Sequence, residues 1–234
     1  MDVSMLKKIL FLFLLTLSIT AFAAKKECPV KPSYDIVINK NNIHIVNQSN
    51  DLSIMSDEQV VLNAKTVLVN KSLRKKLNEF QKSLRLQLPQ LEQQSLNLLL
   101  EVKVAFDQAI TRKLSDDREL HSELNKLYKR LVKLLHRSIN TENGTTTFYY
   151  QNFNNIKKDG EDIGERIFYN VVGGSIVEFN FFKNFGAIKD ISKNEWKTQK
   201  PKLKAFDAHI CSVITDVDQQ YQQILTELHQ SIDK

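Results

Sequence analysis

Glycine, proline and cysteine are scarce in this chain of 234 residues, with six, four and two copies respectively. Such a composition argues against a loop-rich or disulfide-dense scaffold, and the plentiful leucine, lysine and glutamine favour helix. The chain also lacks an apolar run near the ~20 residues that a membrane-spanning helix requires. We therefore expect a mainly helical protein that does not span a membrane.

The longest apolar run lies at the N-terminus and has the pattern of a secretory signal. Two lysines precede the apolar stretch 9–19, and the tripeptide Ala-Phe-Ala ends at Ala23, directly before Ala24. A charged start, a short apolar stretch and small residues at the cleavage site are typical of a signal peptide. The sequence predicts cleavage after Ala23, export to the periplasm, and a single mature domain over residues 24–234.

The mature chain is mildly basic. Removing residues 1–23 takes away two of 33 basic and one of 27 acidic residues, which leaves 31 and 26 and a net charge of +5. Because the chain is exported, anionic lipid headgroups and acidic envelope polysaccharides are better partners for this charge than nucleic acid.

The two cysteines, Cys28 and Cys211, predict a structural disulfide, since an even count is typical of exported chains. A redox or metal site is the alternative. The sequence contains no Cys-x-x-Cys, however, and His209 and Cys211 would not face each other on a helix. The expected bond joins the start of the mature chain to its last helix.

The hydrophobic pattern changes its period near residue 70. Residues 34–69 alternate apolar and polar side chains between Asn, Asp and Ser turns, which predicts an antiparallel meander of three to five strands. Residues from about 70 onwards repeat apolar side chains every three or four positions, which predicts helices. We expect an α+β fold with a small N-terminal β-meander packed on long, mainly antiparallel amphipathic helices.

Within the helical part, Pro89 either interrupts the first helix or starts the next one. A leucine stripe at 120–135 predicts a third helix that ends at Asn143-Gly144, and Thr145 to Tyr150 can return to the sheet as an extra strand. A final helix is expected from about Asn194 to His229.

Several short motifs occur in a characteristic order: Cys28-Pro29-Val30, Asp35-Ile36-Val37-Ile38, Asp51-Leu52-Ser53-Ile54, Leu84-Arg85, Leu88-Pro89, Thr147-Phe148-Tyr149-Tyr150, Glu195-Trp196, Phe206 and Cys211-Ser212. Together they resemble the YggN-like family of proteobacterial periplasmic proteins, a domain of unknown function. The resemblance implies a Gram-negative periplasmic location, a cysteine near each end and no assigned activity. It also implies glycine in the turns near Asp57-Glu58 and Asn63-Ala64, where this chain has none.

No sequence motif for catalysis was found. The chain lacks His-Glu-x-x-His, Gly-x-Ser-x-Gly, a phosphate-binding loop and a dinucleotide fingerprint. Carboxylate pairs such as Asp116 and Asp117 are better explained by helix capping and solvation than by acid–base chemistry. We therefore expect no catalytic residue, no metal and no cofactor.

Two groups of residues are candidates for contacts with partners. Basic side chains gather in two places, where they form either solvated helix faces or a contact for anionic lipid or polysaccharide: Lys71, Arg74 and Lys75, and then Lys197, Lys200, Lys202 and Lys204. The stretch 173–186 is unusually apolar and forms either a core plug or a surface for a partner, through Phe179, Phe181, Phe182 and Phe185.

These features favour a non-catalytic binding or chaperone-like module of the cell envelope, with unfolded envelope proteins as partners. The alternatives are an enzyme that acts on an envelope polymer through carboxylates assembled by the fold, and a purely structural envelope component.

Overall fold

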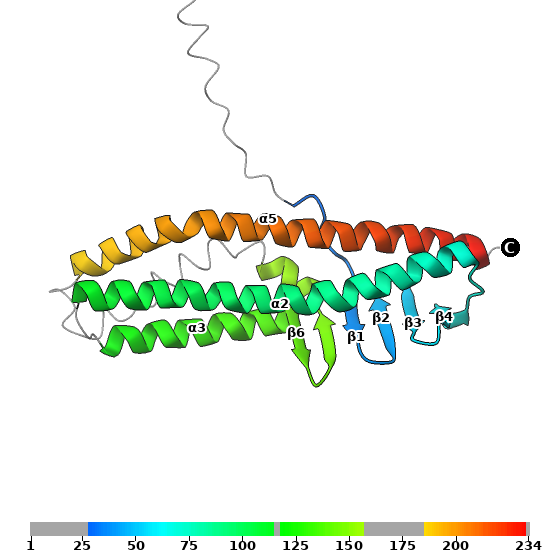
Figure 1. The fold of residues 1–234 in the computed structure, drawn as a ribbon, viewed down its shortest axis with the longest axis horizontal. Helices are drawn as coiled ribbons and strands as arrows, with labels where there is room; N and C mark the ends of the chain where they lie inside the picture. The colour runs from blue at the N-terminus through cyan, green and yellow to red at the C-terminus, as the bar shows by residue number, and fades with distance from the viewer. Residues whose placement is uncertain (1–27, 115–117, 157–184, 233–234) are drawn as a thin grey trace, which may run out of the picture.

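The computed structural model describes residues 28–114, 118–156 and 185–232. A β-sheet occupies one end of an elongated molecule, two long helices run along it and beyond it, and a third long helix lies beside them beyond the sheet (Figure 1). The α+β prediction is confirmed. The predicted cleavage site at Ala23 and Ala24 lies outside the described residues, as do Phe179, Phe181 and Phe182.

The sheet has seven strands in the order β5-β4-β3-β2-β1-β7-β6, and every neighbouring pair is antiparallel. The strands are β1 (Asp35–Ile38), β2 (Asn42–Val46), β3 (Asp51–Met55), β4 (Val60–Leu62), β5 (Lys65–Thr66), β6 (Ile139–Glu142) and β7 (Thr145–Phe148). β1 to β5 form the predicted meander. β7 pairs with β1, so the return of residues 145–150 to the sheet is also confirmed.

β6 was not predicted, and the expected end of the third helix is wrong. That helix, α3 (Arg118–Ser138), stops at Ser138, and the chain continues directly into β6. Asn143 and Gly144 take positive φ angles of 51° and 76° and form the turn of the β6–β7 hairpin. Asn-Gly is a favoured pair for such turns because both central residues need φ above zero. The same dipeptide also ends helices, which explains the error.

The turn between β4 and β5 has the same conformation without the glycine. Asn63 and Ala64 have φ angles of 51° and 63°, close to those of Asn143 and Gly144. A left-handed φ strains an alanine because its Cβ approaches the backbone. The glycine that the family resemblance implies near this turn would relieve that strain.

Replacing Ala64 by glycine is expected to raise the free energy of unfolding by about 0.5–1 kcal/mol, because glycine adopts positive φ without a Cβ clash. Gly144→Ala is the matched reverse change, and we expect it to lower stability by a similar amount. Urea denaturation of both variants checks the pair. A loss of stability in Ala64→Gly would contradict the strain argument.

Pro89 neither ends nor starts a helix, because α2 (Lys71–Leu114) is continuous through it. The Asn70 side chain caps the first turn by accepting a hydrogen bond from the Leu73 amide at 2.9 Å. Leu88 and Leu91 on either side of the proline are buried, and this packing offsets the lost backbone hydrogen bond. The last helix, α5 (Phe185–Ile232), starts nine residues before the predicted Asn194 and contains Pro201.

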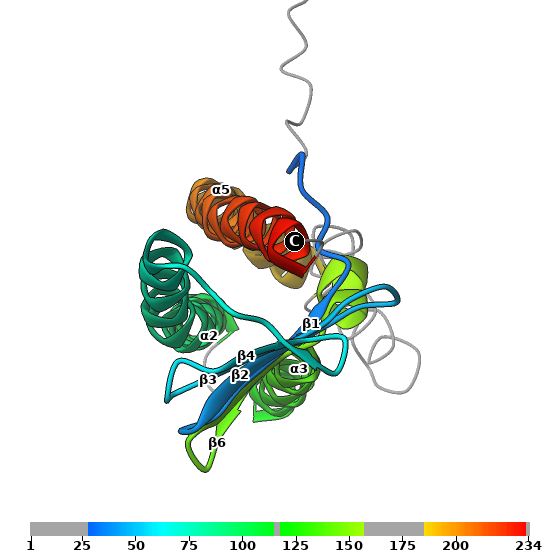
Figure 2. The same cartoon turned by 90° about the vertical axis from the view of Figure 1, so that its right-hand side faces the viewer.

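The main core lies between one face of the sheet and the pair α2 and α5, which cover it together (Figure 2). Alternate strand residues point into it, among them Ile36, Ile43, Ile45, Leu52 and Ile54. A second, smaller core lies far from the sheet, where α2, α3 and the first turns of α5 meet around Phe106, Leu124 and Ile191. None of the described helices has an apolar stretch long enough to cross a membrane.

Candidate functional site

Three polar pairs share a single register and fix the antiparallel alignment of α2 and α5. Lys76 contacts Glu227 at the sheet end, Gln87 donates to Asp216 further along, and Lys202 contacts Glu101 beyond the sheet. α2 also packs along α3, whereas α3 and α5 make only sparse contact with each other in the part of the chain described. α2 is therefore the central helix of the part that extends beyond the sheet, which we call the arm.

Two histidines of α3 pair with two carboxylates of α2. His121 Nδ1 lies 2.7 Å from Asp107 Oδ1, and His136 Nε2 lies 3.4 Å from the buried Glu92. Asp107 also accepts from Lys103 on its own helix. Burial of the Asp107 carboxyl acts to raise its pKa, but the hydrogen bonds and charges of Lys103 and His121 outweigh burial and lower it. These contacts tie the two helices together along the arm.

Replacing Asp107 by asparagine is expected to lower the free energy of unfolding by about 1–2 kcal/mol at neutral pH, since two charge-assisted hydrogen bonds are lost. Because folding lowers the pKa of this carboxyl, its contribution is present above the ordinary aspartate pKa of about 4 and is lost as pH falls through the folded value. The difference between wild type and variant should therefore shrink on acidification. Urea denaturation at several pH values measures it.

The exposed Glu142 supplies a control for this experiment, because Glu142→Gln should leave stability nearly unchanged at every pH. A pH-independent effect of Asp107→Asn would contradict the assigned role of the charge.

Between the two cores, the arm contains a level at which apolar side chains are present but none is fully buried. No residue of α2 between Glu92 and Phe106 is buried, and the same holds for α3 between Leu127 and Ser138. In α5 the corresponding stretch is 200–213. We call the half-buried apolar side chains of this level the middle layer: Leu96, Leu98, Leu99, Val102, Leu131, Val132, Leu134, Leu135, Leu203, Phe206 and Ile210.

The helix registers bring the members of the middle layer to the same height. The Lys202–Glu101 and His209–Gln94 pairs set residues 203–210 of α5 beside the middle of α2. The two histidine–carboxylate pairs bracket the stretch of α3 around Leu131 in the same way. Because α3 and α5 flank α2 without packing closely on each other, the apolar side chains of the layer stay half-buried, in contrast to those of the two cores.

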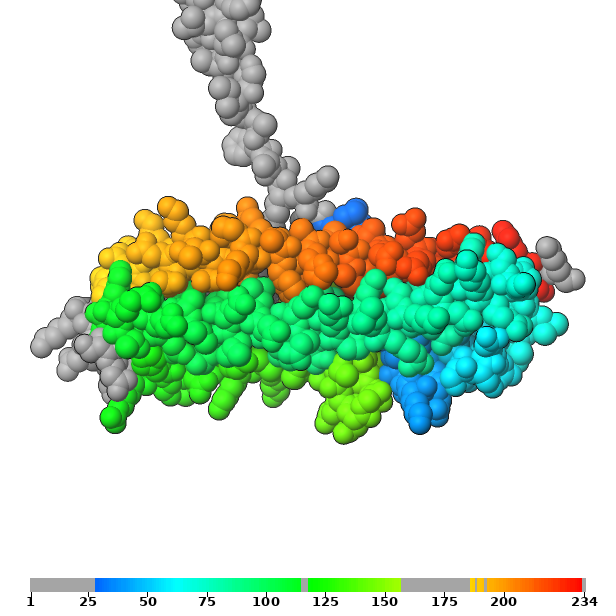
Figure 3. Space-filling view, in the orientation of Figure 1, coloured from blue at the N-terminus to red at the C-terminus, as the bar shows by residue number. Residues whose placement is uncertain are grey.

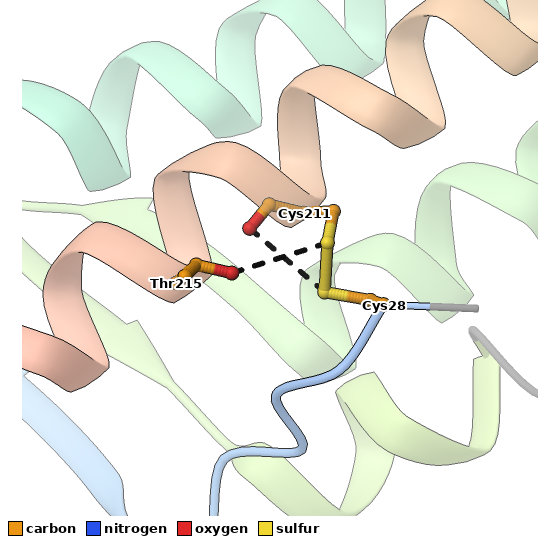
Figure 4. The surroundings of a disulfide bond; sticks show 3 residues. All are labelled: Cys28, Cys211 and Thr215. Carbon is orange, nitrogen blue, oxygen red and sulfur yellow. Dashed lines mark hydrogen bonds between the residues drawn. A yellow bond between two sulfur atoms is a disulfide. The ribbon is translucent and has the colours of Figure 1, made fainter. Parts of the chain in front are cut away.

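The disulfide joins the two cysteines that the sequence predicts. The Cα atoms of Cys28 and Cys211 are 5.5 Å apart, and the bond ties the chain before β1 to the middle of α5 (Figure 4). The Cys211 carbonyl oxygen lies 3.8 Å from Cys28 Sγ, and the Thr215 hydroxyl lies 3.9 Å from Cys211 Sγ. The linked segment then passes Tyr34, whose ring packs on that of Tyr221 with centroids 4.5 Å apart.

This tyrosine pair lies in the main core beside one acid. Burial and the nearby Asp218 carboxylate raise the pKa of Tyr221 to about 12, and the same two causes raise the pKa of Tyr34. The Tyr221 hydroxyl is buried and has no hydrogen-bond partner. The pair fills the space where the disulfide-linked segment meets α5, so its role is in packing.

The two basic clusters are not brought together. By the register of α2 and α5, Lys71 lies level with the end of α5, roughly 40 to 50 Å from Lys197 and Lys204 at 1.5 Å per helical residue. Within the clusters, Arg74 pairs with Glu58 and Lys202 pairs with Glu101. Lys75 lies 3.8 Å from Glu79, and Lys200 also has an interaction partner. Of the four candidate phenylalanines, Phe185 lies within the described residues, as the first residue of α5.

Thr111, His121 and Asp107 form a sequence of hydroxyl, imidazole and carboxylate, the groups of a nucleophilic triad. The Thr111 hydroxyl, however, donates to the Asp107 backbone carbonyl at 3.0 Å, and it lies 3.4 Å from His121 Nε2. Its proton is directed at the helix backbone, so the imidazole does not activate it. In the described ranges, no cluster of three or more His, Cys, Asp or Glu side chains is suited to a metal ion.

A comparison with family models matches residues 28–179 to the family described as "Protein of unknown function (DUF2884)". The chain belongs to this family. Two relatives named "Uncharacterized protein YggN", from Escherichia coli strains K12 and O157:H7, are each 21% identical over 238 aligned positions, which cover 96% of this chain and 100% of each relative. The resemblance to the YggN-like family is therefore confirmed. No solved structure matches the chain.

The family matches assign no activity, so the site rests on the geometry alone. Sequence reasoning missed the middle layer and both histidine–carboxylate pairs. One signal was available for the pairs. In a helical hairpin, two contacts between the same helices share one register, and His121 and His136 on α3 are separated by as many residues as Glu92 and Asp107 on α2.

Proposed function

We propose that this chain is an exported periplasmic protein that binds unfolded envelope polypeptides without catalysing a reaction. The middle layer is the observation that carries the proposal. It offers apolar side chains from three helices at one level of the arm, and none of them is fully buried. An extended polypeptide supplies apolar side chains at short intervals, which is the chemistry that such a layer binds.

Export is supported by two separate features. The N-terminal pattern of charge, apolar stretch and small residues favours a signal peptide that is cleaved after Ala23. The disulfide between Cys28 and Cys211 favours an oxidising compartment, because such bonds persist there and are rare in the cytosol. Residues 24–234 would then be one mature domain.

The phenylalanine-rich stretch 173–186 belongs to the same proposal. Phe179, Phe181 and Phe182 supply further apolar groups, which we propose either fill the core or contact the same partner. The basic side chains add a weaker attraction for anionic partners, since Lys71, Lys197 and Lys204 are exposed and the two clusters lie far apart.

The test uses the oxidised mature chain and a urea-denatured outer-membrane porin as the client, with light scattering on dilution from urea as the measurement. We expect the wild-type protein to suppress aggregation at an equimolar ratio. Leu99→Gln and Leu203→Gln place polar groups in the middle layer from two helices and should reduce that suppression at least several-fold.

The exposed Leu68 is the matched control, because it is 90% exposed and lies before α2. Leu68→Gln should suppress aggregation as well as the wild type does. Thermal melts of all three variants separate lost binding from lost folding. Equal suppression by folded Leu99→Gln, Leu203→Gln and Leu68→Gln proteins would refute the middle layer as the binding site.

A further inference from the structure

The face of α2 that points away from the rest of the molecule has an unusual composition. Exposed residues follow one another there at helical spacing and form what we call the outward stripe: Leu86, Gln90, Gln93, Asn97, Leu100, Val104, Gln108 and Thr111. α2 runs along the front of the molecule, and its surface is open over its length (Figure 3). The stripe contains no charged side chain, although a quarter of the whole chain, 26%, is charged.

Exposed apolar residues gather on this stripe. Five large hydrophobic side chains of the described residues are exposed, and three of them are Leu86, Leu100 and Val104, with exposed fractions of 66%, 47% and 41%. The steps from residue 86 to residue 104 alternate between four and three, which is the spacing of a two-helix coiled-coil contact. A helix face that contacts only water needs neither exposed apolar side chains nor a spacing that alternates between four and three.

We propose that the outward stripe is the interface of a homodimer, in which α2 packs antiparallel against α2 of a second copy. In this register Leu86 of one copy meets Val104 of the second copy, and Gln90 meets Leu100. Gln93 and Asn97, which hydrogen-bond to each other at 3.0 Å within one helix, meet at the centre. Apolar pairs therefore lie at both ends of the contact, and amides lie between them.

The charges beyond the stripe favour the antiparallel arrangement. Lys75, Glu79 and Lys82 continue the same helix face towards the start of α2, while the other end continues with Gln108 and Thr111. A parallel pairing in register would set each of these charged residues against the same residue of the second copy, and the repulsion between like charges is unfavourable. The antiparallel pairing sets them against the end of the stripe at Gln108 and Thr111 of the second copy instead, so no charge of this face meets the same charge of the second copy.

A two-fold contact of this kind closes on itself and stops at two copies. It uses the face of α2 opposite to the middle layer, so it stands independently of the proposed function.

Sedimentation velocity of the oxidised mature chain tests the proposal. We expect the wild-type protein to sediment as a dimer at micromolar concentration and Leu100→Glu to sediment as a monomer with an unchanged melting temperature, because the substituted position is half exposed. Val104→Glu provides the same change at a second position. Leu68→Glu, which places the same charge on an exposed leucine outside the stripe, should remain dimeric.

Disulfide trapping tests the register. Chains with Gln90→Cys should cross-link to chains with Leu100→Cys, whereas Gln90→Cys alone should not, since its two copies would lie roughly 15 Å apart along the helix axis. A monomeric wild type, a dimer unaffected by both glutamate variants of the stripe, or efficient cross-linking of Gln90→Cys alone would each overturn the proposal.

Discussion

Replacing Cys28 and Cys211 by serine is expected to lower the free energy of unfolding by about 5 kcal/mol. The two cysteines are 183 residues apart in sequence, so the disulfide closes a very long loop and removes much of the conformational freedom of the unfolded chain. The chain-entropy model gives about 5 kcal/mol for such a loop, as an upper figure. The loss is comparable with the whole stability of many domains.

The structure adds a second reason for a large effect. The bond anchors the segment that leads into β1 and places Tyr34 against α5. Without the bond, this segment can detach from α5 before the sheet itself unfolds. Urea denaturation of the double serine variant and of the oxidised wild type measures the difference.

The reduced wild-type protein is the control, because it should match the double serine variant within error. Non-reducing peptide mapping of protein purified from the cell envelope should yield one linked peptide pair, together with an N-terminal peptide that begins at Ala24. Two alkylatable thiols in that sample, or equal denaturation midpoints for the oxidised and serine proteins, would contradict the assigned role.

The fold class could be predicted because each element carries its own period. Ile43 and Ile45 point to one side of β2 and His44 to the other, and the burial of β2 follows this alternation. In α2, Leu73, Leu77 and Phe80 repeat at helical spacing and are all buried. The local hydrophobic period specifies these elements, and the tertiary contacts bury the same side chains that the period selects.

Pro89 and β6 show where local signals do not decide. A proline has a strong preference against a helix interior, but the burial of Leu88 and Leu91 in the main core keeps α2 continuous through it. In β6, Asn140, Thr141 and Glu142 form no apolar alternation, because β6 is an edge strand and is specified by pairing with β7. Both features depend on distant parts of the chain.

The middle layer could not be predicted for a related reason. Leu98, Leu131 and Leu203 look like ordinary core residues in the sequence, and periodicity does not separate a half-buried leucine from a buried one. Their state depends on the relative heights of three helices, which are set by pairs such as Lys202–Glu101 across long sequence distances. The absence of catalytic motifs, by contrast, was directly readable.

Replacing Tyr221 by alanine is expected to destabilise the protein by about 3–5 kcal/mol, the range for loss of a large buried aromatic side chain. Tyr221 has no exposed surface, and its ring packs on Tyr34 with centroids 4.5 Å apart. Its removal leaves a cavity where α5, the disulfide-linked segment and the sheet meet. Thermal and urea denaturation should show this loss without a change in fold.

Tyr221→Phe is the sharper test because it removes only the hydroxyl. That group is buried without a hydrogen-bond partner, so phenylalanine should be neutral or stabilising by about 1 kcal/mol at neutral pH. Folding raises the pKa of Tyr221 to about 12 through burial and the Asp218 carboxylate. Below the unfolded pKa of about 10, the hydroxyl is protonated in both states and its contribution to the stability of the wild type does not depend on pH. As pH rises from there towards the folded pKa, the hydroxyl ionises in the unfolded chain first, and the wild type loses stability.

The advantage of Tyr221→Phe should therefore grow above pH 10, by up to about 1.4 kcal/mol per pH unit, because phenylalanine does not ionise in the unfolded chain. Urea denaturation at neutral and at alkaline pH measures both effects on the same two proteins. The exposed Tyr149 is the control, since Tyr149→Phe should change stability little at either pH. A clear loss of stability in Tyr221→Phe at neutral pH would show that the hydroxyl has a partner, and the packing role assigned to Tyr221 would need revision.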